Sequence, residues 1–211
     1  MMFFKYSLKE QKMKNTPQHV VIQKIAEDLP VIYSCIKDGW AIYQKEYPEH
    51  LKIAHTSRSR ASLVHDHIAS LARQRLEPRF GVHCHEIQKL FLVSFNSGVV
   101  IRFKKLDDNF RSSNIRTQQS LGFMEQETLP EIGKAINLQA GYRLNELETD
   151  IEGIYLTLPI GESGNAWIFE LNEADFARGN VVDLPTMTQQ KSKGIRFTKK
   201  GGEDASESSK S

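Results

Sequence analysis

The segment LFLVSFNSGVVIRFKK, residues 90–105, predicts how the whole chain is organised. Its two apolar halves flank the turn sequence NSG, an arrangement typical of a β-hairpin. The first half is apolar on both faces, so we expect a central strand that is covered on both sides. In the second half successive side chains alternate, which places Arg102 and Lys104 on the face opposite Ile101 and Phe103. The hairpin is therefore expected to carry two cations next to a hydrophobic core.

Apolar residues recur at helical spacing before this hairpin and in strand-like runs after it. The patterns predict helices near residues 19–29, 31–47 and 57–76, and later strands at 138–144, 151–158 and 166–171. Helices followed by strands, without regular alternation, indicate an α+β domain. In it, N-terminal helices pack on an antiparallel sheet of about five strands.

The polarity of the two ends sets the expected domain limits. Residues 1–15 are basic and irregular, and we expect a flexible segment there. Residues 187–211 are mostly Gln, Lys, Gly, Ser and Glu, a composition that buries too little apolar surface to offset its ordering entropy. We therefore expect a single domain over residues 16–186 and a disordered tail after it.

The composition is that of a soluble globular protein. The chain has 211 residues, of which 39% are hydrophobic and 26% charged, and its net charge is +2. So small a charge attracts nucleic acid only if the basic residues gather in a local patch. Two cysteines do not make a disulfide framework, and no run resembles a membrane span or a signal peptide. We expect a cytoplasmic protein without a membrane partner.

Basic and hydrogen-bonding residues are the first candidates for a functional site. The sequence SRSR at residues 57–60 places two arginines beside the free N–H groups of a helix start, which favours an anion. Alternatively Ser57 caps the helix and the aliphatic part of Arg60 covers the core. The candidates for one partner-binding or anion-binding site are Arg58, Arg60, Arg102, Lys104, Lys105, Arg111, Ser113, Asn114, Gln118 and Gln119. A merely solvated face is the alternative.

Histidines are the candidates for catalysis or metal binding. His65 and Asp66 could supply an acid–base group, but His65 and His67 lie roughly 200° apart around a helix and cannot readily share an ion. His83 and His85 would share one face of a strand and could in principle hold zinc. Too few further ligands are evident to complete such a site, and we expect no cofactor.

A metal-dependent nuclease of the restriction type fits the hairpin poorly. Such an enzyme needs an acid on one strand and an acid-x-lysine pattern on the next. Arg102 stands where the acid before Lys104 should be, and Asp107 and Asp108 follow the lysines instead of preceding them.

Several distinctive strings carry a family resemblance. They are SRSRASLVHD at 57–66, RFKKLD at 102–107, SSN at 112–114, TQQ at 117–119 and GYRLN at 141–145. In this order they resemble a poorly characterised bacterial family. Its members are typically encoded beside a gene for a helix-turn-helix or ImmA/IrrE-like metallopeptidase protein. The resemblance covers about residues 20–171 and implies one half of a toxin–antitoxin or phage-defence module of the Rosmer type.

Three hypotheses of different classes follow. The first is a non-catalytic protein that binds the product of the adjacent gene and controls its activity or stability. The second is an enzyme that acts on nucleic acid or a phosphorylated small molecule, with His65 or Asp66 as the acid–base group and the basic residues clamping phosphate. The third is a DNA-binding regulator, whose affinity would fall steeply with salt.

Overall fold

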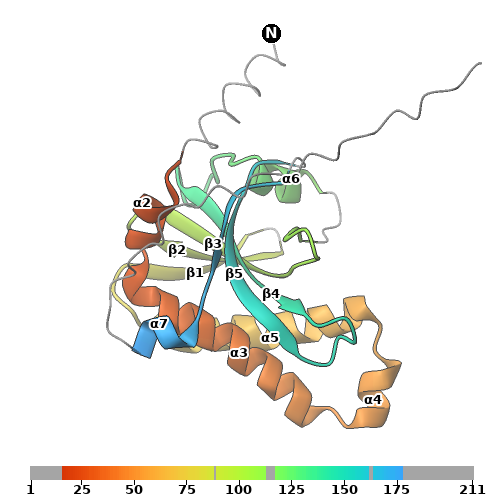
Figure 1. Cartoon of the computed structure of the whole chain (residues 1–211). Helices are drawn as coiled ribbons and strands as arrows, with labels where there is room; N and C mark the ends of the chain where they lie inside the picture. The colour runs from red at the N-terminus through yellow and green to blue at the C-terminus, as the bar shows by residue number, and fades with distance from the viewer. Residues whose placement is uncertain (1–15, 88, 113–116, 162–163, 178–211) are drawn as a thin grey trace, which may run out of the picture.

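The computed structural model describes residues 16–87, 89–112, 117–161 and 164–177 (Figure 1). The predicted terminal segments 1–15 and 187–211 lie outside these ranges, as does the predicted end of the domain at residue 186. No helix within the described ranges combines the length and the apolar character that crossing a membrane requires.

The N-terminal part is helical, and α3 and α5 match the apolar periodicity, whereas the helix predicted near residues 19–29 is divided into α2 and η1, and α4 was not predicted. It contains α2 (Gln18–Gln23), the short 3-10 helix η1 (Ala26–Asp28), α3 (Leu29–Glu46), α4 (Glu49–Ala54) and α5 (Ser57–Arg75). Pro30 lies in the first turn of α3, where its missing N–H costs nothing. The helices α3 and α5 pack closely, since an added Cβ at Gly39 would come 2.6 Å from Cγ1 of Ile68. These two long helices lie together on one face of the sheet (Figure 1).

Over the described residues, the sheet has six strands in the order β1-β2-β3-β4-β5-β6. The strands are β1 (Val82–Ile87), β2 (Leu90–Phe95), β3 (Val99–Lys105), β4 (Ile136–Leu144), β5 (Ile151–Pro159) and β6 (Asn165–Glu170), and the short helix α7 (Glu173–Ala177) follows. The α+β class and the β2–β3 hairpin are confirmed. The sheet has six strands, not about five, because β1 also belongs to it.

The expectation of a purely antiparallel sheet is wrong at one position. The strands β3 and β4 are parallel, and the other neighbouring pairs are antiparallel. Parallel neighbours need a crossover connection, and residues 106–135 provide it. This crossover contains α6 (Gln118–Met124), which packs on the face of the sheet opposite α3 and α5.

The core has two parts because both faces of the sheet are covered. The larger cluster joins α3 and α5 to inward side chains such as Val93, Ile101 and Phe103. The smaller cluster joins Phe123 of α6 to Leu92 and neighbouring residues on the other face. Consequently Arg102, which lies on the face opposite Ile101 and Phe103 as the alternation predicts, is buried beneath α6.

Candidate anion-binding cleft

The sheet forks between β2 and β3. The two strands pair only from Val93 with Ile101 to Phe95 with Val99. Beyond this point β2 keeps its pairing with β1, and β3 keeps its pairing with β4. The strands therefore separate toward the end of β3. A cleft of about 1380 Å³ opens there, bordered by α5, the β1–β2 turn, the end of β3 and the β4–β5 turn.

Two cations line the inner wall of this cleft. Arg102 is only 8% exposed, and Lys104 is partly buried. The guanidinium of Arg102 reaches Oγ of Ser120 at 3.5 Å, at the limit of a hydrogen bond. Within the described part of the chain, neither cation has a carboxylate within ion-pair distance. Buried charged side chains ordinarily form ion pairs, so two neighbouring cations without a carboxylate partner are unusual.

Burial changes the proton affinity of the groups around the fork. Desolvation lowers the pKa of Arg102 to about 10 and, together with the charge of Arg102, the pKa of Lys104 to about 8. His65 projects from α5 into the same cleft, and desolvation and the charge of Lys104 lower its pKa. At neutral pH the inner cleft thus holds two cations beside a neutral imidazole.

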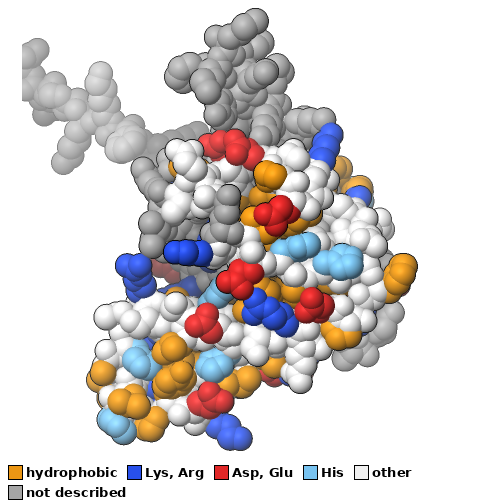
Figure 2. Space-filling model, turned by 180° about the vertical axis from the view of Figure 1, so that it is seen from behind, with side chains coloured by type: hydrophobic (Ala, Val, Ile, Leu, Met, Phe, Trp, Pro, Cys, Tyr) orange, Lys and Arg blue, Asp and Glu red, His pale blue; other side chains and the backbone are white. Residues whose placement is uncertain are grey.

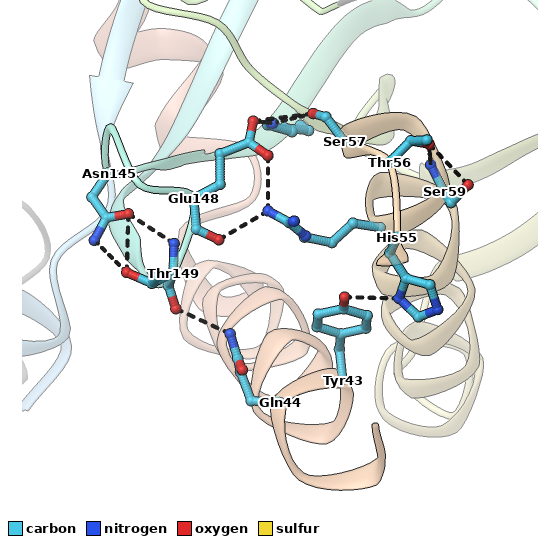
Figure 3. Close-up of polar contacts among 11 residues, drawn as sticks. Tyr43, Gln44, His55, Thr56, Ser57, Ser59, Asn145, Glu148 and Thr149 are labelled. Atoms are coloured by element: carbon cyan, nitrogen blue, oxygen red, sulfur yellow. Dashed lines mark hydrogen bonds and ion pairs between the residues drawn. The ribbon is translucent and has the colours of Figure 1, made fainter. Parts of the chain in front are cut away.

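Three further cations at the cleft, Arg60, Lys105 and Arg143, form ion pairs, and Glu148 accepts two of them (Figure 3). This residue lies in the β4–β5 turn and accepts hydrogen bonds from Lys105, from Nη1 of Arg60 at 2.8 Å and from Oγ of Ser57 at 3.0 Å. The hydrogen bond from Lys105 is the largest cause that holds the pKa of Glu148 below its usual range. Glu148 therefore ties the β4–β5 turn to the start of α5.

The start of α5 differs from the predicted cap. Thr56 is the capping residue, and its hydroxyl accepts the N–H of Ser59 at 3.1 Å. The hydroxyl of Ser57 instead contacts Glu148 and Lys105. The first turn of α5 is thus already occupied by an internal carboxylate.

The outer rim of the cleft carries charges of both signs. Arg143 contacts Asp108 at 3.2 Å and Glu152 at 3.1 Å. The remaining charged residues of the lining include Arg58, Lys89, Asp107 and Glu146. Figure 2, which shows the molecule from behind, likewise has basic and acidic side chains interspersed, without one continuous basic area.

The cleft brings together some of the predicted residues but not all of them. Arg58, Arg102, Lys104 and Lys105 line it, and Arg60 contributes to the Glu148 contacts. The remaining described candidates do not line it: Arg111, Gln118 and Gln119. Gln118 and Gln119 are exposed in the first turn of α6. Ser113 and Asn114 lie outside the described residues.

The histidine candidates are placed less favourably for catalysis. His65 faces the cleft, whereas the Asp66 side chain is largely exposed and lies 3.7 Å from the His65 ring. In β1, the rings of His83 and His85 lie 6.4 Å apart, and Nε2 of His85 is 2.7 Å from Oγ of Ser94. Over the described ranges, His, Cys, Asp and Glu side chains form no group of three that could hold a metal ion.

Sequence reasoning missed Glu148 and Arg143, which complete the lining of the cleft. Both come from the β4–β5 hairpin, and Glu148 lies 88 residues from its partner Arg60. Comparison with protein-family models, curated proteins and solved structures gives no match. The functional argument therefore depends on the residues of the chain itself.

Proposed function

We propose that the protein is a non-catalytic binding component that anchors an anionic group of its partner in the fork between β2 and β3. The observation that supports this is the pair of cations Arg102, which is buried, and Lys104, which is partly buried: among the residues that the structure describes, no carboxylate lies within ion-pair distance of either. A buried cation of this kind lowers stability unless an anion compensates it. An anionic group of a partner would provide that compensation and would form the centre of the contact.

The mixed charges of the rim favour a protein partner over a nucleic-acid strand. A strand carries a phosphate at every nucleotide and is bound by a groove that stays basic along its length. Here the basic residues of the rim alternate with acids such as Glu148 and Asp108, which would repel the neighbouring phosphates. A protein surface can match charges of both signs around one central anion.

The family resemblance suggests who the partner is. In a two-gene toxin–antitoxin or phage-defence module, it would be the product of the adjacent gene, a protein of helix-turn-helix or metallopeptidase type. The binding component would then control the activity or stability of that protein. Such control needs a complementary surface with a few buried anchors and no catalytic group.

Co-purification with the adjacent gene product tests this proposal. Lys104→Met removes one of the two charges of the inner cleft, and Lys105→Met is the matched control because Lys105 is paired with Glu148. We expect Lys104→Met to weaken the complex about tenfold or more, and Lys105→Met to weaken it far less. A complex that Lys104→Met leaves unchanged would refute the assigned binding site.

One observation favours a second candidate, an enzyme that acts on a phosphorylated substrate. His65 is held neutral beside two cations, which suits a general base next to a bound phosphate. His65→Gln should then abolish turnover of a phosphoester and leave partner binding intact. If the parent protein binds its partner but turns over no phosphoester, the non-catalytic binding component is favoured over the enzyme.

A further inference from the structure

The charge balance of the inner cleft indicates which anion it accepts. Arg102 and Lys104 are two residues apart on one strand, so both side chains project from the same face of β3. Both are predominantly protonated at neutral pH, and the charge of Arg102 is one cause of the lowered pKa of Lys104. The nearby His65 contributes no charge at that pH because its pKa is also lowered. The inner wall therefore carries two positive charges.

A carboxylate would compensate only one of these charges. A single negative charge bound to Arg102 would leave Lys104 partly buried without its own counter-charge, and the same holds in reverse. Glu148 does not supply the second charge, because it is shared between Arg60 and Lys105, and Asp108 and Glu152 are paired with Arg143. No carboxylate of the described residues lies within ion-pair distance of the charged nitrogens of Arg102 or Lys104. The ligand that balances the site carries two charges on one compact group.

A phosphate monoester meets this requirement. With a second pKa of about 6 it is a dianion at neutral pH, and it has three terminal oxygens. Two of them match the planar guanidinium of Arg102 in a bidentate contact, while the ammonium of Lys104 can donate to the third. Arg102 and Lys104 start only about 7 Å apart along the strand, which their long side chains can span around one phosphoryl group.

We propose that the fork between β2 and β3 is a site for a phosphate monoester dianion, with Arg102 and Lys104 as its ligands. This proposal builds on the anion-binding function proposed above and specifies the chemistry of the bound group. The group can belong to a phosphorylated side chain of the partner or to a phosphorylated small molecule.

Phenyl phosphate and phenyl sulfate form a matched pair of probes. Both present three terminal oxygens on the same ring, but the sulfate ester carries one charge where the phosphate ester carries two. Titration calorimetry on the full chain at pH 7.5 and constant ionic strength compares their affinities. We expect phenyl phosphate to bind about tenfold more tightly, because one additional charge-assisted contact forms.

Variants assign that preference to the fork. Lys104→Met should remove the preference for phosphate over sulfate, whereas Lys105→Met should keep it. Equal affinities for the two esters, or a preference that survives Lys104→Met, would overturn the proposal. Circular dichroism and urea unfolding of each variant establish that the comparison is made between folded proteins.

The outcomes also separate this proposal from the function on which it rests. If Lys104→Met disrupts the partner complex but the esters bind equally or not at all, the anion-binding function stands and the phosphate assignment fails. If Lys104→Met changes neither the partner complex nor ester binding, both the anion-binding function and the phosphate assignment fail. Where phenyl phosphate is preferred, phosphatase treatment of the partner distinguishes the sources. A lost complex assigns the phosphoryl group to a partner side chain, and an unchanged complex assigns it to a small molecule.

Discussion

Lys104→Met should make the free protein more stable. Lowering the pKa of this lysine from 10.5 to about 8 means that its charged form is disfavoured in the folded state by about 3 kcal/mol. Methionine has a similar length, carries no charge and suits a partly buried position. Because no ion pair of Lys104 in the described residues is lost, we expect the free energy of unfolding to rise by about 2–3 kcal/mol at pH 7.

The pH dependence of this gain follows from the same shift. Below pH 8 the lysine is charged in both the folded and the unfolded state, so the folded state carries the full cost. Between pH 8 and 10.5 the folded state loses its proton while the unfolded state keeps it, and the stability of the parent protein rises with pH. The advantage of Lys104→Met should therefore be smaller by about 2 kcal/mol near pH 9.5 than at pH 7.

Urea unfolding at pH 7 and pH 9.5 measures both effects. Lys105→Met is again the matched control, since it removes a paired lysine at the next position and should lower the stability by about 1 kcal/mol. A Lys104→Met protein that is less stable than the parent at pH 7 would refute the reasoning. So would a gain that does not change with pH, because the charge would then not be its cause.

Three further outcomes follow from particular contacts. Glu148→Gln should lower the free energy of unfolding by about 1 kcal/mol at pH 7. Because the pKa of this carboxyl is lowered, the difference from the parent protein in urea unfolding should shrink as the pH falls below 4.5. Gly39→Ala should lower the free energy of unfolding by about 1–2 kcal/mol despite the better helix propensity of alanine, since the new Cβ meets Ile68 at 2.6 Å. An increase in stability, measured by thermal unfolding, would contradict the close packing of α3 and α5. Phenyl phosphate binding should weaken above about pH 8, because Lys104, which is close to Arg102 and His65, then loses its proton. It should also weaken below pH ~6, because the ester then gains a proton. Calorimetry across this range should show both decreases for phenyl phosphate, and only the decrease above pH 8 for phenyl sulfate.

Local signals predicted most of the elements but not how they meet. The periodicity over residues 57–76 and the turn sequence NSG gave α5 and the β2–β3 hairpin almost as observed. The parallel pairing of β3 and β4 could not be read from local patterns, because the alternation of side chains along a strand is the same whichever direction its neighbour runs.

The cleft was predictable in part for the same reason. Arg102 and Lys104 were visible as cations on one face of a strand, but their burial depends on α6 covering that face. Glu148 carried no local signal at all, since its contacts to Lys105 and Arg60 join residues 43 and 88 positions apart. Long-range pairing of this kind is set by the topology of the sheet and not by residue spacing.

The parallel crossover is what would make the proposed site selective. A lysine and an arginine at an exposed hairpin end would stay hydrated and would attract any anion weakly. The crossover instead returns through α6, whose Ser120 is buried beside the guanidinium of Arg102, and leaves that arginine 8% exposed. The forked strands then keep one side of the pair open to a ligand. Because water no longer compensates the two charges fully, a ligand that supplies two negative charges gains more than one that supplies a single charge. The element that destabilises the free protein is thus the element that would distinguish a phosphoryl group from a carboxylate.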